Sequence, residues 1–413
     1  MNYILMAIPG FLILILIELA WVAYKKKPVY RLNDAVNSLA MGMMSRVTQI
    51  LYAAIPFSFY IYFQEHYALM EWSNEIWTWV FAFITYDLGY YWNHRIGHTM
   101  NISWASHIIH HSSEEYNLTT ALRQTSVPNV VGWVFYLPLA FLGIDPIIFA
   151  SVAALNLLYQ FWVHTQAIDQ MPKWYEAIFV TPSNHRVHHA KNKVYIDRNY
   201  GGVFILWDRL FKTYQPELKQ EPVVFGISTQ LASWNPIWGN LHFITQLCKD
   251  AWHAHSIKDK LTLWFKRTGY RPADVEDRFP IVKSNDEVKK YDTELTKLEQ
   301  GYVFAQLAIN FLLVFGFLNI AAQLPIEAHF VMGSILILSL YSMGLVQERK
   351  PNRITMEIVK FSAIIACMVF MVNAPIWLII LTSGVAVMCI TALLFSKKDT
   401  AEPKNTTTEM NIM

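Results

Sequence analysis

HRIGHTMNISWASHIIHHSS, residues 94–113, decides how this chain is interpreted. The stretch holds five of the 14 histidines in the 413-residue sequence. It directly follows WTWVFAFITYDLGYYW, residues 77–92, which has the composition of a membrane helix. Histidines that gather where a helix leaves a bilayer require a physical reason.

The composition is that of a membrane protein rather than a soluble one. Apolar residues make up 54% of the chain and charged residues 15%, whereas soluble domains carry about 25% charged residues. Long stretches have no charge at all and are rich in Ile, Leu, Phe and Trp. No basic patch of the kind that binds nucleic acid occurs, so that class of partner is excluded.

Nine stretches are apolar enough to be candidate membrane spans, since about 17–25 such residues cross a bilayer. They lie at 3–24, 47–63, 76–93, 130–143, 145–163, 302–322, 329–346, 355–372 and 374–395. The fourth and fifth are short and joined by GIDP, so a re-entrant hairpin is an alternative for them. The first has its positive charges after the apolar run, which predicts a retained anchor rather than a cleaved signal peptide.

The distribution of Lys and Arg predicts the orientation, because positive loops stay in the cytoplasm. Positive segments occur at 25–31, 347–360 and 396–399, whereas 64–75, 143–146, 323–328 and 373–375 have neither Lys nor Arg. All nine spans then alternate consistently, with the N-terminus outside, the C-terminus inside and every histidine cluster on the cytoplasmic side. The bacterial inner membrane and the endoplasmic reticulum would give the same pattern.

The fold expected from this pattern is all-α, a polytopic membrane protein with a helical catalytic cap on the cytoplasmic side. Five regions are predicted: N-terminal membrane helices at 1–75, a histidine-rich catalytic region at 76–215, cytoplasmic or interfacial helices at 216–300, C-terminal membrane helices at 301–396 and a disordered tail at 397–413. In the third region Trp residues alternate with Lys and Arg, which is typical of helices lying on a membrane surface; a small cytosolic helical subdomain is the alternative.

Three histidine clusters have members three or four residues apart. They are His94 and His98; His107, His110 and His111; and His185, His188 and His189. Residues three or four apart share a helix face, so each cluster can direct two or three imidazoles to one place. Eight imidazoles exceed the need of one tetrahedral zinc and suit two metal ions. Iron, copper, zinc and nickel all accept imidazole. His164, which ends the fifth apolar stretch, is a candidate ninth ligand.

A purely structural role and a role in metal transport fit these clusters less well than a fixed metal centre. Isolated histidines at the end of a membrane helix are often structural, but three clusters with matching spacing rarely arise by chance. A metal transporter would need ionisable ligands near the middle of the bilayer. The histidines here lie at the ends of the predicted spans and in loops, which favours a fixed metal centre.

Asp87 and Tyr91 share the helical face of His94 and His98. Metal-bound histidines commonly donate their second N–H to a carboxylate, so Asp87 is predicted to support a ligand in this way. An ordinary hydrogen bond between helices is the alternative.

Further polar candidates near the metals are predicted to hold a cosubstrate or a lipid head group, or to form a solvated helix start: Glu114, Glu115, Asn117, Arg123 and Gln124. The last candidates for supporting a metal ligand or a cosubstrate are Asn199 and Asp208, in the stretch NYGGVFILWDRLFKTY.

Five motifs together resemble the fatty acid hydroxylase / sterol desaturase superfamily. They are HRIGH at 94–98, HIIHHSSEEYNLTTALRQ at 107–124, LYQFWVHT at 158–165, TPSNHRVHHAKN at 181–192 and DRNYGGVFILWDRLF at 197–211. The likeness covers residues 80–215, and within the superfamily it is greatest for the branch that oxidises glycerol ether lipids. One departure is Lys212, because the turn after the Trp-Asp pair usually reads Phe-Gly-Thr.

The resemblance implies a membrane-bound enzyme with two iron ions that uses O2 to hydroxylate or desaturate a lipid drawn from the bilayer. The eight clustered histidines would be the ligands. In the ether-lipid branch the hydroxylated product collapses to an aldehyde and a glycerol, and tetrahydrobiopterin supplies the electrons. Other branches act on sterols, fatty acids or carotenoids and take electrons from cytochrome b5-like or ferredoxin-like donors.

Overall fold

The computed structural model describes residues 3–281, 289–371 and 374–396. Within these ranges the secondary structure is helical apart from two isolated bridges, which confirms the all-α prediction. The predicted disordered tail, 397–413, lies outside the described residues. The chain divides into two compact units, Met1–Asp292 and Thr293–Met413.

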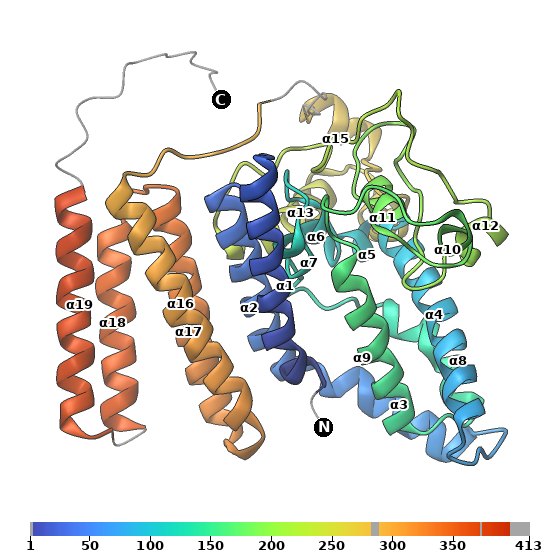
Figure 1. The fold of residues 1–413 in the computed structure, drawn as a ribbon, viewed down its shortest axis with the longest axis horizontal. Helices are drawn as coiled ribbons and strands as arrows, with labels where there is room; N and C mark the ends of the chain where they lie inside the picture. The colour runs from blue at the N-terminus through green and yellow to red at the C-terminus, as the bar shows by residue number, and fades with distance from the viewer. Residues whose placement is uncertain (1–2, 282–288, 372–373, 397–413) are drawn as a thin grey trace. The chain divides into compact units, whose positions relative to one another are not determined.

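The first unit combines long helices with many short ones (Figure 1). Its elements are α1 (Tyr3–Lys25), α2 (Leu32–Tyr52), α3 (Ala54–Tyr67), α4 (Ile76–Thr99), α5 (Asn101–Ala105), α6 (Ile108–His111), α7 (Leu118–Ala121), η1 (Gly132–Tyr136), α8 (Leu137–Phe141), α9 (Pro146–Trp162), α10 (Lys173–Ile178), α11 (Pro182–His188), α12 (Leu206–Leu210), α13 (Pro236–His253), α14 (Ile257–Thr262), η2 (Leu263–Phe265) and α15 (Ala273–Arg278).

Helices α4 and α9 form the frame that carries the histidines. They pack against each other, and a buried apolar cluster that includes Ala82 on α4 and Val152 on α9 fills the space around them. The start of α9 is fixed by Asp145, whose carboxylate accepts hydrogen bonds from the backbone N–H groups of Ile147 and Ile148. Such a cap satisfies N–H groups that have no partner within the helix.

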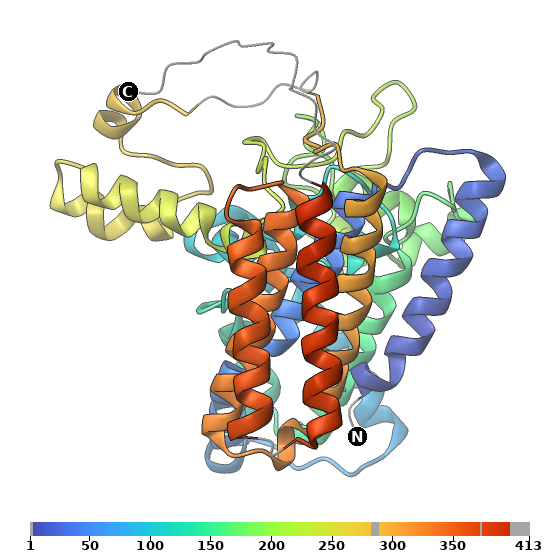
Figure 2. The ribbon, with the colours of Figure 1, turned by 90° about the vertical axis from the view of Figure 1, so that its left-hand side faces the viewer.

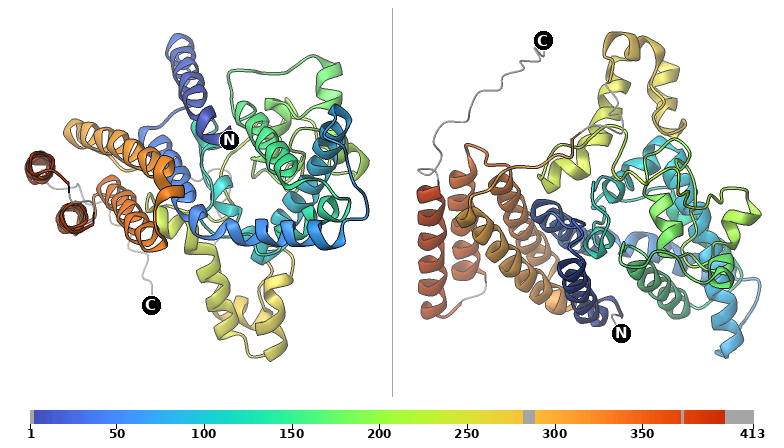
Figure 3. Two further views of the ribbon diagram at one scale, coloured as in Figure 1. Left: turned by 90° about the horizontal axis from the view of Figure 1, so that it is seen from below. Right: turned by 45° about the horizontal axis from the view of Figure 1, so that its top comes forward.

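Short helices gather at one end of α4 and α9 and form the predicted cap (Figure 1). Two of them begin with reciprocal capping hydrogen bonds: Asn117 with Thr120 at α7, and Thr181 with Asn184 at α11. These bonds fix where each short helix starts. Helices α13 to α15 project away from the rest of the unit (Figures 2 and 3).

Four helices of the described residues have both the length and the apolar composition to cross a membrane. They are Met6–Lys25, Lys297–Gln323, Ile326–Gln347 and Ile376–Ser396. The chain is therefore an integral membrane protein, as predicted. Three further predicted spans, 76–93, 145–163 and 355–372, also fall on helices, of 24, 17 and 18 residues.

Two of the nine predicted spans do not form one continuous helix. The stretch 47–63 is broken, because α2 ends at Tyr52 and α3 begins at Ala54. Pro56 explains the break, since a proline ring in a continuous helix clashes with the carbonyl four residues earlier, here that of Tyr52. The stretch 130–143 contains only η1 and the five-residue α8, which are too short to span as helices.

The loops that were predicted to share one side of the membrane meet in the structure. The backbone N–H of Leu69 donates to the carbonyl of Phe141 at 2.8 Å, and the indole N–H of Trp72 donates to the carbonyl of Leu142 at 2.7 Å. The loop 64–75 and the GIDP turn therefore lie together. The irregular segment 130–143 consequently reaches the end of α4 that is opposite to the histidines.

The second unit is a bundle of four helices, α16 (Lys297–Ile320), α17 (Ile326–Gln347), α18 (Arg353–Phe370) and α19 (Ile376–Ser396), with the 3-10 turn η3 (Ala321–Gln323) between the first two (Figure 2). Its interior contains a buried ion pair, with the Lys360 ammonium 2.6 Å from the Glu357 carboxylate. Ser342 and Tyr302 donate hydrogen bonds to the same carboxylate, and Lys360 also donates to Gln306.

Candidate metal centre

Nine histidines from four segments converge at the capped end of α4 and α9. His94 and His98 are on the last turns of α4, and His164 follows the end of α9. The others are on or next to two short helices: His107, His110 and His111 at α6, and His185, His188 and His189 at α11. The predicted convergence of the three clusters, and of His164 with them, is thus present in the structure.

The nine side chains separate into two groups. One contains His94, His98, His107, His111 and His188, and the other contains His110, His164, His185 and His189; within each group the candidate ligand atoms lie within 4.8 Å of one another. The groups adjoin, because the rings of His111 and His189 stack with their centroids 4.3 Å apart. The arrangement is that of two neighbouring metal positions.

The imidazole nitrogens approach each other closely within each group. In the first, the Nε2 atom of His107 lies 3.0 Å from the Nε2 atoms of both His94 and His111. In the second, the Nε2 atom of His164 lies 3.2 Å from that of His110 and 3.0 Å from that of His185. All nine side chains are buried except that of His107, which is partly exposed.

Backbone carbonyls fix the orientation of four of these rings. The Nδ1 atoms of His94, His110, His164 and His188 lie 2.8–2.9 Å from the carbonyl oxygens of Tyr200, Arg123, Gln160 and Arg198 respectively. Each Nδ1 must carry the proton, because a carbonyl can only accept. The Nε2 atom of each neutral ring is therefore a bare lone pair that points into its group.

These lone pairs show that the groups suit a cation. His110 and His164 both use their Nδ1 proton elsewhere, yet their Nε2 atoms face each other at 3.2 Å. Two neutral acceptors at this distance repel unless a cation lies between them. In addition, the buried Nε2 atoms of His98 and His188 have no hydrogen-bond partner in the described structure. Metal ligation satisfies both features, since it uses the imidazole lone pair.

Burial keeps the imidazoles neutral and ready to bind metal. It lowers the pKa of His110 to about 4 and lowers the pKa of His185, His188 and His189 well below the usual value. Neighbouring imidazoles lower the pKa of His185 and His189 further. Neither group includes a carboxylate or a cysteine among the described residues, so the candidate ligands are all uncharged.

Among the described residues the Asp87 carboxylate accepts no hydrogen bond from a histidine, and the prediction that it supports a ligand directly is wrong. Its carboxylate accepts hydrogen bonds from the backbone N–H groups of Val203 and Phe204 and from the side chains of Asn156 and Trp207, at 2.6–3.0 Å. It thereby holds the segment that supplies the Tyr200 carbonyl. A Cβ atom at Gly202 would lie 2.8 Å from this carboxylate, so glycine is required there.

Asp208 anchors the same segment from its other side. Its carboxylate accepts hydrogen bonds from the N–H groups of Tyr200 and Gly201, each at 2.8 Å, and from the hydroxyl of Thr213 at 2.7 Å. The Tyr91 hydroxyl lies 3.0 Å from that of Thr213. Asp208 thus acts on His94 through Tyr200 alone, whereas Tyr91 is linked to Asp208 through the hydroxyl of Thr213.

Asn199 also holds this loop. Its side-chain amide donates to the carbonyls of Asn184 and Gln215 and accepts from the N–H of Gln215. Asn184 belongs to α11, the helix of the third histidine cluster. The backbone of Asn199 is left-handed, with φ of 55°, a conformation that asparagine tolerates better than most residues.

Arg123, in the 114–124 segment, directly contacts a histidine, because its carbonyl accepts a hydrogen bond from His110. Its buried guanidinium donates to the carbonyl of Ile109, next to His110, and to Asn37 on α2. The side chain therefore ties the second histidine cluster to α2.

The other predicted residues of this segment form structural contacts. Glu115 pairs with Arg31 at 2.5 Å and with Lys290 at 2.9 Å, Asn117 donates to the carbonyl of Val29, and Gln124 donates to that of Ala121. Glu114 accepts from Gln230 and from the N–H of Tyr291. The cavity beside Glu114 and Arg123 is about 10 Å³, the room that roughly one water needs. This cavity is too small for a cosubstrate, so that role stays a prediction.

The aromatic walls of the centre were not predicted from the sequence. The ring of Tyr116 stacks on that of His164, and the ring of Trp104 packs against His98 and His111. Tyr116 is fully buried, and its hydroxyl donates to the carbonyl of Val163. Both residues lie between or beside the histidine motifs, but an aromatic residue there has no spacing that distinguishes it from ordinary core.

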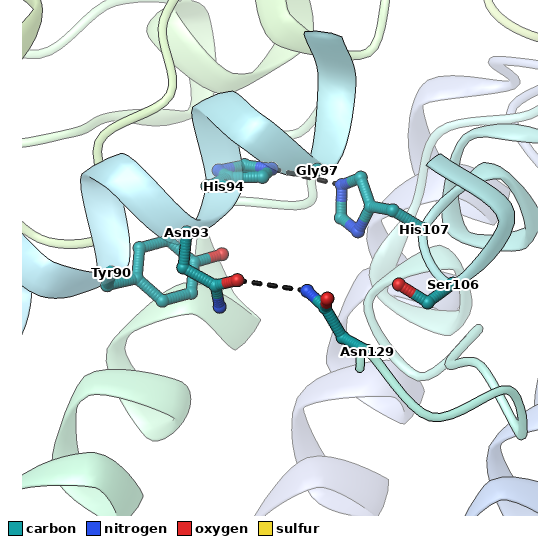
Figure 4. Close-up of a pocket in the computed structure, with 7 residues that line it drawn as sticks. All are labelled: Tyr90, Asn93, His94, Gly97, Ser106, His107 and Asn129. Carbon is teal, nitrogen blue, oxygen red and sulfur yellow. Dashed lines mark hydrogen bonds between the residues drawn. The ribbon is translucent and has the colours of Figure 1, made fainter. Parts of the chain in front are cut away.

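One cavity adjoins the five-histidine group (Figure 4). It measures about 90 Å³ and is lined by Tyr90, Asn93, His94, Gly97, Ser106, His107 and Asn129. His94 and His107 form the wall that faces the group, and His107 is the partly exposed member of the nine histidines. The cavity therefore borders the five-histidine group at its partly exposed member.

Fold and centre together define a class: integral membrane proteins in which an all-histidine candidate metal site forms at one end of two packed helices, here α4 and α9. Comparison with known proteins agrees. Residues 79–213 match the fatty acid hydroxylase family. The chain is 36% identical to human alkylglycerol monooxygenase over 364 residues, which is 86% of this chain and 80% of that protein. The zebrafish enzyme (Danio rerio) is also 36% identical, over 87% of this chain and 80% of its own length.

A more distant relative is the ornithine lipid hydroxylase of Rhizobium tropici, 23% identical over 51% of this chain and 66% of that protein. No solved structure gives a significant match. The chain belongs to the alkylglycerol monooxygenase family. It is therefore a monooxygenase, an oxidoreductase that acts on lipids.

Proposed function

We propose that this chain is a di-iron monooxygenase that uses O2 to hydroxylate the ether-linked carbon of glycerol ether lipids. The observation that carries the proposal is the pair of all-histidine groups, with five and four members, in a chain of the alkylglycerol monooxygenase family. Imidazole accepts several metals, and the family resemblance is what favours iron among them.

The reaction explains why the chain builds such a centre. Bound metal supplies the oxidising power for breaking an unactivated C–H bond, which side chains lack. One oxygen atom of O2 enters the C–H bond and the other leaves as water, with two electrons and two protons supplied by a reductant. The hydroxylated ether is a hemiacetal, which breaks down to an aldehyde and a free glycerol hydroxyl.

The chain's own residues hold, orient and shield the centre. The carbonyls of Tyr200, Arg123, Gln160 and Arg198 fix which nitrogen of four histidines is free, and such supporting bonds tune metal affinity. Burial of eight of the nine histidines excludes water from most of the site, which protects it from side reactions.

Tetrahydrobiopterin is the proposed reductant, with a cytochrome b5-like or ferredoxin-like protein as the alternative. We further propose that the centre faces the cytoplasm and that the N-terminus is outside, in the bacterial inner membrane or the endoplasmic reticulum. The pairing of Arg31 with Glu115 supports this orientation, because it places the first positive segment at the histidine end of the unit, and positive segments stay in the cytoplasm.

The test uses the full chain purified in detergent. Its iron content is measured, and it is then incubated with a 1-alkylglycerol, tetrahydrobiopterin and O2. We expect close to two irons per chain, O2-dependent consumption of the pterin, and one aldehyde formed per alkylglycerol lost. Turnover of a sterol, fatty acid or carotenoid without any aldehyde from the alkylglycerol would overturn the ether-lipid assignment. Metal flux in vesicles without O2-dependent oxidation would overturn the oxygenase assignment itself.

A further inference from the structure

The cavity beside His94 and His107 has features that the metal centre alone does not explain. Its volume is about 90 Å³, against about 10 Å³ for the cavity beside Glu114 and Arg123. A water needs about 10–15 Å³ by this measure, so the larger cavity admits a polar group of several heavy atoms. A complete lipid needs far more room, because pockets for drug-sized ligands measure about 300–1,000 Å³.

Gly97 is the first unexplained feature. It lies inside α4, where glycine costs about 1 kcal/mol relative to alanine. Its backbone is not left-handed, and a Cβ atom there would meet only the Cβ of His107, at 4.0 Å. Gly89, on the same helix, contrasts with it, because a Cβ there would lie 2.8 Å from the carbonyl oxygen of Phe135. Packing therefore demands Gly89, whereas Gly97 only keeps the cavity open.

The second feature is a pair of amides on the cavity wall (Figure 4). The Nδ2 atom of Asn129 donates to the Oδ1 atom of Asn93 at 2.9 Å, and the Nδ2 atom of Asn93 donates to the Tyr136 hydroxyl at 3.2 Å. The Oδ1 atom of Asn129 accepts from the N–H groups of Val131 and Gly132, which fixes the orientation of the amide.

The amide pair keeps hydrogen-bonding capacity for a ligand. An amide nitrogen carries two N–H groups, and the bonds of Asn93 and Asn129 within the described structure each use one of them. Ser106 donates its hydroxyl proton to the carbonyl of Ser103, so its oxygen keeps lone pairs that can accept. The wall thus offers both donors and an acceptor, the combination that a hydroxyl group requires.

The lining also excludes one type of ligand. None of the residues that line the cavity carries a formal charge when the histidines are neutral. A cationic head group would have to leave water without an opposite charge to meet it, which is costly. The cavity therefore favours a neutral, hydroxyl-bearing group over an ammonium.

Apolar side chains continue outward from the amide pair. Val130 and Val134, which follow Asn129 in the chain, are 60% and 47% exposed. They lie on a segment that joins the histidine end of the first unit to the opposite end. An alkyl chain that is too long for the cavity can lie along this apolar surface, while the polar end of the same molecule occupies the cavity.

We infer that this cavity is the binding site for the neutral, hydroxyl-bearing end of the lipid substrate, with Asn93 and Asn129 as its specificity-determining residues and Gly97 as the residue that leaves it room. The inference rests on the proposed function. In an alkylglycerol the carbon to be oxidised is joined to the glycerol unit through a single oxygen. Binding that unit here places the carbon beside the wall formed by His94 and His107.

The first experiment narrows the cavity. Gly97→Ala and Gly97→Leu are compared with Gly316→Leu, which adds the same side chain on α16 where nothing lies within 4 Å. Metal content and thermal stability in detergent are measured with the kinetics. We expect unchanged metal content in all variants, an increased KM for the alkylglycerol in Gly97→Ala, and at least a tenfold lower kcat/KM in Gly97→Leu. Wild-type kinetics in Gly97→Leu would overturn the inference.

The second experiment tests the chemistry of recognition. Wild type and Asn129→Ala are assayed with a 1-alkylglycerol and with the same ether whose two free hydroxyls are methylated. Loss of one or two neutral hydrogen bonds changes relative kcat/KM by about tenfold, so the wild-type preference for free hydroxyls should shrink by about that factor in the variant. An unchanged preference would overturn the inference. Failure of the wild type to oxidise any alkylglycerol would instead overturn the proposed function, and the two failures are therefore distinguishable.

Discussion

The Nε2 atom of His164 lies 3.2 Å from the Nε2 atom of His110, and this contact joins the end of α9 to the second histidine cluster. Both rings donate their Nδ1 proton to a backbone carbonyl. His164 is thus equivalent in geometry to the histidines of the clusters, although it has no histidine neighbour in the sequence.

His164→Ala should therefore remove metal from the four-histidine group. Three imidazoles remain in that group, and we expect the metal content per chain to fall by about half and the oxygenase activity to be lost. Metal analysis of the purified variant checks this. His242→Ala is the matched control, because His242 is a partly buried histidine on α13 that belongs to neither group. Full metal content in His164→Ala would remove this residue from the ligand set.

Acid should destabilise the metal-free protein. The pKa of His110 is lowered by burial to about 4, from an ordinary value of 6.5. Between these two values the unfolded chain binds a proton that the folded chain does not, so the free energy of unfolding rises with pH. We expect full stability above pH 6.5 and progressive loss as the pH falls from 6.5 towards 4. Thermal denaturation of chelator-treated protein across this range checks the prediction, and a flat profile would contradict it.

Asp87→Asn should weaken the centre without touching a ligand. The Asp87 carboxylate accepts from four N–H groups, and an amide would turn an NH₂ group towards some of these donors. Leaving buried groups unpaired costs about 1–3 kcal/mol. We expect a lower melting temperature and weaker metal retention, because the segment carrying the Tyr200 carbonyl shifts. Asp274→Asn, at a partly exposed carboxylate on α15 that pairs with Arg278, serves as the control, and metal retention equal to wild type in Asp87→Asn would contradict this role.

The ligand clusters follow from sequence spacing, but their assignment to two groups does not. His107 and His111 lie one turn apart and join the five-member group, whereas His110 joins the other. Consecutive residues on a helix point about 100° apart, so His110 and His111 cannot share a metal position easily. Which histidines of a cluster join which metal-ligand group depends on how α6 and α11 pack against the rest of the unit. No local pattern in the sequence encodes this packing.

The role of Asp87 could not be predicted for a related reason. Asp87 lies four residues before Tyr91 and seven before His94, so its carboxylate is a plausible partner for either side chain. Two of its four donors are the backbone N–H groups of residues 203 and 204, more than 100 positions later in the chain. Backbone N–H groups have no sequence signature, so such a contact is visible only in the folded protein. The helix break near Pro56, by contrast, is encoded locally by a proline. Hydropathy values alone do not reveal this signal.

Lys212→Gly should stabilise the protein. Resembling sequences usually carry glycine in the turn after the Trp-Asp pair, whereas this chain has Lys212. The backbone of Lys212 is nevertheless left-handed, with φ of 60°. This conformation costs an L-residue about 1–2 kcal/mol, and the greater freedom of glycine in the unfolded chain offsets about 0.5–1 kcal/mol of the gain. We expect the free energy of unfolding to rise by up to ~1.5 kcal/mol. Lys212→Ala keeps the strain and should show no such gain; equal effects of both substitutions would refute strain at this turn as the cause.

Lys360→Met should destabilise the C-terminal bundle strongly. The variant leaves the Glu357 carboxylate buried without its cation, with Tyr302 and Ser342 as its remaining donors. Removing one partner of a buried ion pair costs about 3–5 kcal/mol, whereas replacing both partners by apolar groups of similar volume is often neutral. The double variant Glu357→Leu/Lys360→Met should therefore be more stable than Lys360→Met alone. Thermal denaturation of the full chain in detergent distinguishes the two, and a double variant less stable than the single one would show that the carboxylate stabilises the bundle through its hydroxyl donors rather than through the ion pair.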